Sequence, residues 1–99
     1  MAYPHTAAPE IDEQTALTDL QRIPGVGKSI ARDLWNLGVR SPGDLRGQDP
    51  ETLYERLCAY QRTRVDRCML YVFRCAVYFA SNERHESDLL KWWNWKDRA

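Results

Sequence analysis

The sequence is poor in the features that define several classes of protein. It contains three cysteines, an odd number without a Cys-x-x-Cys pair, which argues against a disulfide framework. Its apolar runs, such as residues 75–80, are far shorter than the roughly 20 residues of a membrane-spanning helix. No basic segment followed by an apolar one opens the chain, so no secretory signal is expected. Together these absences predict a soluble, cytoplasmic protein.

Net charge is also lacking, because 14 basic side chains balance 14 acidic ones. The distribution is uneven, however. Residues 22–46 contain five basic and two acidic side chains, and residues 61–81 contain four basic and one acidic. Residues 1–21, by contrast, contain four acidic side chains and no basic one. These two basic islands permit local phosphate binding. Affinity for a nucleic acid rises with the number of phosphates neutralised, so only weak binding is expected.

Strand signals are missing as well, since no segment alternates apolar and polar residues over a strand's length. Apolar residues recur instead at helical spacings, which predicts an all-α, compact single domain of about five to six short helices. Residues 1–12 are expected to form a flexible arm and residues 13–99 the domain. Helices are expected at about 14–23, 28–37, 42–46, 50–60 and 65–80, with a last short one opening near Ser87.

Capping residues and prolines mark the expected helix boundaries. Ser41 and Asp49 each precede a proline. Each is therefore expected to be the N-cap of a helix that has this proline at its first position. Gly38 is expected to end the helix at 28–37 in a left-handed conformation. Thr63 and Asp66 stand at a spacing close to that of a capping box before the longest helix.

A turn rich in glycine, residues 23–27 with the sequence Ile-Pro-Gly-Val-Gly, lies between the first two expected helices. Two glycines one residue apart permit backbone angles that side chains forbid, so the turn can point N–H groups into one concavity. The next helix begins there, and its unsatisfied N–H groups and positive dipole end face the same place. The turn is therefore expected to bind one phosphate through the backbone of Gly25, Gly27 and Ser29.

Two cations flank this expected anion site. Lys28 and Arg32 lie four residues apart on one helix face, where each can reach a phosphate without reading a base. Val26 is expected to pack back on the helices and set the turn. A bulky residue at Gly27 is expected to impair folding and binding together. The predicted nucleic-acid-binding residues are Gly25, Val26, Gly27, Lys28, Ser29 and Arg32.

The segment at residues 20–37 resembles the helix-hairpin-helix family, whose pattern of an apolar residue, proline, glycine, an apolar residue and glycine is matched at residues 23–27. The resemblance implies sequence-independent binding to the DNA backbone, as an accessory to DNA transactions. A longer resemblance, over residues 17–97, is to the small bacterial pathogenicity locus family, whose members are labelled mitomycin-resistance proteins, and to the C-terminal domain of TfoX-type competence regulators. It is carried by GVGKSIARDLWNLGVRSPGDLRGQDPETLYERLC, VDRCMLYVFRCAVYFA and LKWWNWKD.

An alternative function leaves the hairpin as a structural joint in a protein-interaction or homo-oligomerisation module. The longest expected helix carries a stripe of arginine and tyrosine at spacings of three and four residues. Such a stripe suits a second nucleic-acid contact, a subunit interface or a solvated boundary face. Its members as a possible secondary contact are Arg64, Arg67, Tyr71 and Arg74.

An aromatic and basic tail closes the chain, with Trp92, Trp93 and Trp95 between Lys91 and Lys96. Exposed aromatic rings of this kind are typical of proteins that stack on unpaired bases. A tryptophan-rich terminus more often packs on the core, and here we expect the tail to pack on Trp35 and the longest helix.

The remaining chemistry-bearing residues do not form a recognisable site. Cys68 and Cys75 are two helical turns apart, about 10 Å, which is too far for one zinc ion, and the cysteines are expected to be small buried hydrophobes. The Gly-Lys-Ser at 27–29 lacks the spacer of a nucleotide-binding P-loop. Asp44 suits the first turn of a helix rather than a catalytic position. We therefore expect no metal, no cofactor and no catalysis.

Overall fold

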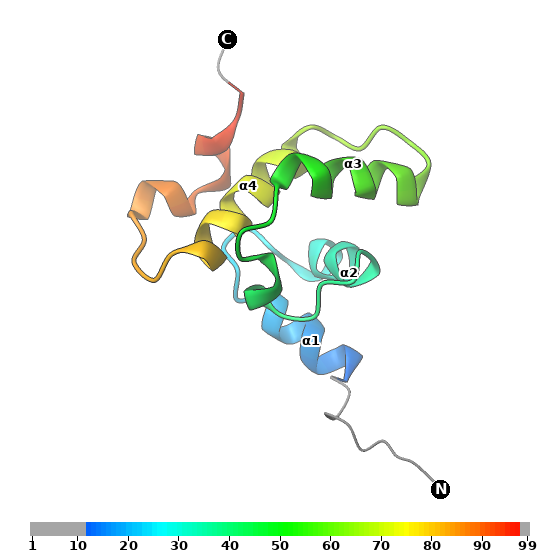
Figure 1. Cartoon of the computed structure of the whole chain (residues 1–99), viewed down its shortest axis with the longest axis horizontal. Coiled ribbons are helices and arrows are strands. Elements are labelled where there is room, and N and C mark those ends of the chain that lie inside the picture. The colour runs from blue at the N-terminus through cyan, green and yellow to red at the C-terminus, as the bar shows by residue number, and fades with distance from the viewer. Residues whose placement is uncertain (1–11, 98–99) are drawn as a thin grey trace, which may run out of the picture.

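The computed structural model describes residues 12–97, which form helices and turns without a strand (Figure 1). The all-α prediction is therefore confirmed for this part of the chain, whereas the arm expected at residues 1–12 lies almost wholly outside the described residues. Within these residues, four α-helices and three short 3-10 helices follow one another as α1 (Glu13–Leu20), α2 (Lys28–Asn36), η1 (Pro42–Leu45), α3 (Pro50–Gln61), α4 (Cys68–Ser81), η2 (Ser87–Leu90) and η3 (Trp92–Trp95).

Helix α4 lies at the centre of the fold, and α3, η1, η2 and η3 pack against it, while α1 packs against α2 (Figure 1). Its inward face carries Leu70 and Phe73, both with 0% of their surface exposed. The core continues through Leu34 of α2 and Leu53 and Leu57 of α3, which are equally buried. Burial of this apolar surface supplies the main driving force for folding. No helix among the described residues is long and apolar enough to cross a membrane.

Helix α1 ends at Leu20, three residues before the predicted end at 23. Over residues 21–23 the backbone N–H groups donate to carbonyls three residues back, as from Ile23 to Leu20 at 3.1 Å, so the helix tightens into 3-10-type turns. Pro24 disfavours the α conformation at Ile23, which explains why the helix stops short. Ile23 is still buried, with 1% of its surface exposed.

The end of α2 confirms the expected role of Gly38. This residue has φ +93°, the left-handed region that glycine tolerates. The Gly38 N–H donates to the Trp35 carbonyl at 2.9 Å, and the Val39 N–H donates to the Leu34 carbonyl at 3.0 Å. These two bonds form a Schellman motif, and the buried side chain of Val39 completes it.

Capping by Asp49 is also confirmed, because its side chain accepts the N–H of Glu51 at 3.3 Å and the hydroxyl of Thr52 at 2.9 Å. Ser41 occupies the N-cap position of η1 before Pro42, as predicted, but its side chain makes no capping hydrogen bond there. The longest helix starts three residues later than predicted, at Cys68 rather than at about residue 65. Asp66 accepts the N–H of Cys68 at 2.8 Å, so the helix begins at Cys68.

The last expected helix is instead two 3-10 helices, η2 and η3, separated by Lys91 in an extended conformation (φ −100°, ψ 111°). Ser87 is the first residue of η2 rather than its cap. The cysteines also differ from expectation: Cys75 is buried, Cys58 is half-buried and Cys68 is exposed. Burial raises the pKa of the Cys75 thiol to about 11, which suits a small apolar filler.

Candidate nucleic-acid interface

The connection between α1 and α2 contains a tight turn at residues 23–26. The Val26 N–H donates to the Ile23 carbonyl at 3.0 Å, and Gly25, at the third position, has φ +86°. Proline at the second position and a positive φ at the third are typical of a type II turn. Val26 has 5% of its surface exposed, so its side chain anchors the turn in the core, as predicted from its position.

Helix α2 begins immediately after this turn, with Gly27 at its N-cap and no side chain there to satisfy the first amides. The Gly27 carbonyl accepts the N–H of Ala31 at 2.9 Å, and residues 27–29 are exposed. Gly27 has φ −96°, an ordinary value, and a Cβ added to it would meet no atom within 4 Å. The backbone at the positive end of α2 therefore faces open space.

A cleft of about 450 Å³ lies between α1 and the first turns of α2. One wall comes from α1 and the residue after it, and the other from α2. Lys28, Ser29 and Arg32, three of the predicted site residues, all line this cleft, together with Gln14, Leu17 and Gln21. The structure thus brings the two predicted cations and the start of α2 to one place.

The two cations of the cleft are not equivalent. Arg32 forms an ion pair with Glu13 of α1, and both side chains are about half exposed, at 50% and 45%. Within residues 12–97, Lys28 forms no ion pair. A surface pair of this kind contributes little stability, typically about 0–1 kcal/mol, so Arg32 can exchange Glu13 for another anion at small cost. Lys28 is the more readily available cation.

Sequence reasoning missed the contribution of α1 to this cleft. Gln14, Leu17 and Gln21 are spaced by three and four residues, which places them on one side of a helix. That signal was present, but nothing in the sequence assigned this side to α2 rather than to solvent. Glu13, the partner of Arg32, was missed for the same reason.

Gly25 lies on the other side of the turn, beside the C-terminal tail. A Cβ added to Gly25 would lie 3.1 Å from Cδ1 of Trp92 in η3. Gly25 and Trp92 also border a second, smaller cavity of about 290 Å³, with Met69 and Val72 of α4. The two glycines therefore have different surroundings: Gly25 contacts the tail, and Gly27 faces the open side of α2.

The arginine and tyrosine stripe of α4 holds the C-terminal tail through Asp97. Arg67 Nε lies 2.7 Å from an Asp97 carboxylate oxygen, and the Tyr71 hydroxyl donates to the same carboxylate at 3.3 Å. Arg74 pairs with Asp97 at 2.9 Å and with Glu51 at 2.8 Å. The hydrogen bonds from Arg67 and then Arg74 lower the pKa of Asp97 to about 2.

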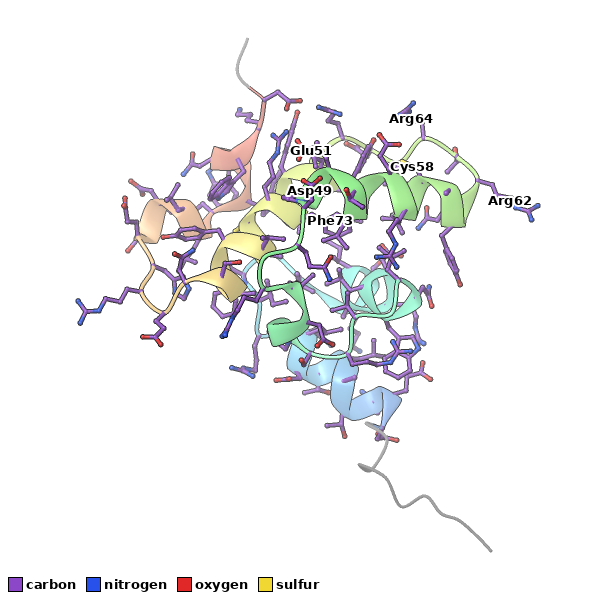
Figure 2. All side chains as sticks on the ribbon, viewed as in Figure 1. Asp49, Glu51, Cys58, Arg62, Arg64 and Phe73 are labelled. Atoms are coloured by element: carbon purple, nitrogen blue, oxygen red, sulfur yellow. The ribbon has the colours of Figure 1, made fainter. Side chains whose placement is uncertain are left out.

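Arg64 stands apart from the other members of the stripe. It lies in the segment between α3 and α4, before the helix begins, and its side chain points away from the molecule together with that of Arg62 (Figure 2). Three of the four predicted secondary-contact residues, Arg67, Tyr71 and Arg74, thus bind the carboxylate of Asp97.

The tryptophans divide into packed and exposed rings. Trp92 packs against the core, and the Trp95 ring lies 5.5 Å from that of Tyr78, while its Nε1–H donates to the Leu89 carbonyl at 2.8 Å. Trp93 has 50% of its surface exposed. The expected contact of the tail with the longest helix is present. Trp35, the other partner expected for the tail, stacks with Arg40, whose Cζ lies 3.6 Å from the centroid of the Trp35 ring.

The structure also places Asp44 and the possible metal-binding side chains. Asp44 accepts the backbone N–H of Arg40 at 2.9 Å, a structural role next to α2. Within residues 12–97, no group of three or more His, Cys, Asp or Glu side chains is gathered so that it could hold a metal ion.

The fold and this cleft define a class: a small all-helical protein with a glycine turn and a basic helix start at one surface. The chain belongs to the pathogenicity locus family, because the family model Cdd1, described as "Pathogenicity locus", matches residues 13–99. This confirms the family resemblance predicted from the sequence. The similarity to TfoX-type regulators stays a prediction.

A curated relative is the mitomycin resistance protein McrB of Streptomyces lavendulae. It is 38% identical to this chain over 60 residues, which make up 61% of this chain and 57% of that protein. The match therefore spans little more than half the length of the relative. No solved structure matches the chain.

Proposed function

We propose that α1, the turn and α2 form a helix-hairpin-helix that binds the DNA backbone without reading sequence. The protein acts as a cytoplasmic accessory in DNA transactions, by binding rather than by catalysis. One backbone phosphate sits at the N-terminus of α2, where it accepts hydrogen bonds from the first amides. Lys28 and Arg32 contact the flanking phosphates.

The observation that carries this proposal is the open backbone at Gly27. A glycine is not needed there for conformation, since its φ of −96° suits any residue. It does leave space, with no atom within 4 Å of an added Cβ, so a phosphate can approach the amides closely. The start of a helix favours anions through its free N–H groups and its dipole. Lys28, at the wall of the adjacent cleft, adds a full positive charge.

Substitution of Lys28 tests the proposal. In Lys28→Ala we expect several-fold weaker binding to a labelled duplex of any sequence, and a salt dependence of log K reduced by about 1, because one phosphate contact is lost. Fluorescence anisotropy at several salt concentrations measures both quantities. The circular dichroism melt should not change, since Lys28 is exposed and forms no ion pair within residues 12–97.

Arg84→Ala is the matched control, since it removes one positive charge far from the turn. The turn lies near the first residues of α4, where Met69 and Gly25 border one cavity, whereas Arg84 follows the last residue, Ser81. The 14 residues of α4 separate these ends by about 20 Å. Equal loss of affinity in both variants would mean that only total charge matters, and would contradict the proposed site.

The alternative is a homo-oligomerisation module in which the hairpin is structural. The exposed rings of Tyr60 (58%) and Trp93 (50%) favour it, because aromatic side chains are enriched in protein interfaces. This function predicts self-association that increases with protein concentration and is lost in Tyr60→Ala or Trp93→Ala. Sedimentation velocity distinguishes it from DNA binding by a monomer.

A further inference from the structure

Trp93 is a large aromatic residue of the tail that stays exposed. Its neighbours Trp92 and Trp95 are each partly buried against the rest of the fold, while Trp93 keeps 50% of its surface in contact with solvent. An exposed indole costs free energy, because its apolar surface stays in water. The local packing leaves half of the surface of Trp93 uncovered.

The position of Trp93 is fixed relative to the turn through Trp92. Trp92 lies against Gly25, where an added Cβ would be 3.1 Å from its Cδ1 atom. The rings of Trp92 and Trp93 meet edge to face, with centroids 5.7 Å apart and planes at 86°. This is a favourable geometry for an aromatic pair, so Trp92 orients Trp93. Gly25 in turn is two residues from Gly27, where the phosphate is proposed to bind.

The charges around Trp93 favour an anionic partner over an apolar one. Lys91 and Lys96 flank the ring in sequence and are both exposed. The Lys91 ammonium lies 3.5 Å from Asp88, a pair at the solvent-exposed surface. Asp97 is the first acidic residue after Trp93 in the sequence. It forms ion pairs with Arg67 and Arg74, so its negative charge is compensated.

We propose that Trp93 stacks on an unpaired DNA base next to the phosphate held at the start of α2. The preferred ligand is then DNA with a junction between duplex and single strand, rather than an uninterrupted duplex. This inference rests on the proposed function, because the bound phosphate sets the position of the neighbouring nucleotide. In an intact duplex both faces of each base are covered by its neighbours, and only an unpaired base offers a face to the ring.

The experiment compares three labelled ligands with the full chain: a blunt duplex, the same duplex with a single-stranded extension, and that extended duplex with an abasic first unpaired position. We expect the extended duplex to bind about tenfold more tightly than the blunt one, the size of one base–aromatic stack. Removing that one base should abolish the preference. This comparison uses the unaltered protein, so it does not depend on how any variant folds.

Variants identify the ring responsible. In Trp93→Ala we expect affinity for the extended duplex to fall about tenfold to the level of the blunt duplex, with blunt-duplex affinity unchanged. Trp93→Phe should retain most of the preference, since it keeps an aromatic face. A 2-aminopurine at the first unpaired position should be quenched on binding by the wild-type protein and not by Trp93→Ala.

The possible failures are distinguishable. Salt-dependent binding that is equal for all three ligands would overturn the role of Trp93 and leave the proposed function standing. Absence of binding to any DNA would overturn both. A wild-type dimer that becomes a monomer in Trp93→Ala, with unchanged DNA affinity, would assign the ring to a second copy of this chain and overturn the stacking proposal.

Discussion

At the scale of single residues, the two glycines of the turn have separate roles. Gly25 is required by the backbone, because φ +86° is a conformation that side chains disfavour, and by the close approach of Trp92. Gly27 meets neither condition, since its φ is −96° and the space beside it is open. The space beside Gly27 gives no steric reason for a Cβ there to impair folding, whereas Gly25 has such a reason. The expectation that a bulky residue at Gly27 impairs folding and binding together stays a prediction.

Alanine at each glycine separates folding from binding. Gly25→Ala should lower the free energy of unfolding by about 1–2 kcal/mol, the cost of a left-handed conformation, and by more if Trp92 must shift. Gly27→Ala should cost less than about 1 kcal/mol, as expected for the loss of a modest N-cap residue, and should weaken DNA binding because the Cβ occupies the phosphate approach. Urea denaturation followed by circular dichroism, with anisotropy on the same samples, gives both values.

Gly43→Ala is the matched control, because Gly43 lies in η1 and an added Cβ would meet only Ser41 Oγ at 3.8 Å within 4 Å. It should change neither stability nor binding by a measurable amount. A Gly27→Ala protein that binds DNA as well as the wild type would remove the main support for a phosphate at the start of α2.

At the scale of elements, the sequence predicted best where local chemistry decides. Helix α2 and helix α3 begin and end within one residue of expectation, because Gly38 and Asp49 act on their own neighbours. The start of α4 was misplaced, since Val65 is held out of the helix by distant contacts. Its N–H donates to Cys58 Sγ at 3.4 Å, and its carbonyl accepts the Tyr54 hydroxyl. Sequence periodicity does not contain such contacts.

The same limit applied to the stripe on α4. Its spacing indicated that Arg67, Tyr71 and Arg74 share a face, which the structure confirms, but their partner is Asp97, at the far end of the chain. A carboxylate there occupies the kind of site that a phosphate would, since both are anions suited to arginine. Only the three-dimensional path of the tail shows that this surface is already taken.

The attachment of η3 to α4 through Asp97 should depend on pH. The pKa of Asp97 is lowered from 3.8 to about 2, so the folded protein favours its ionised form. Its stabilising effect is then complete above a pH of about 4 and is lost as the pH falls toward 2. Asp97→Asn should therefore lower Tm at pH 5 and make progressively less difference at lower pH.

Asp88→Asn is the matched control. This carboxylate belongs to the same tail, but its side chain is 83% exposed and it pairs with a single lysine, Lys91, at 3.5 Å. Tm is measured for all three proteins from pH 2 to pH 6. A Tm difference between the wild type and Asp97→Asn that stays constant over this range would contradict the ion-pair role of Asp97.

At the scale of the whole molecule, the charges limit how strongly the protein can bind DNA. The 14 bases and 14 acids cancel, and several of the bases are paired internally: Arg67 and Arg74 with Asp97, and Arg32 with Glu13. At the candidate site the cations available to bind phosphate are therefore Lys28 and, once its ion pair with Glu13 is broken, Arg32. The proposed interface therefore neutralises few phosphates, which is why a stacking contact at Trp93 would matter for affinity.

The salt dependence of the wild-type protein tests this limit directly. With about two phosphates neutralised, log K for a blunt duplex should fall against log salt with a slope near −1.8, or about tenfold from 50 to 200 mM. A basic protein that makes six to ten contacts would lose about a thousandfold or more over the same range. Anisotropy titrations at four salt concentrations give the slope. A slope steeper than about −5 would mean that Arg62, Arg64 or a second copy of the chain extends the interface, and that the site at α2 is only part of it.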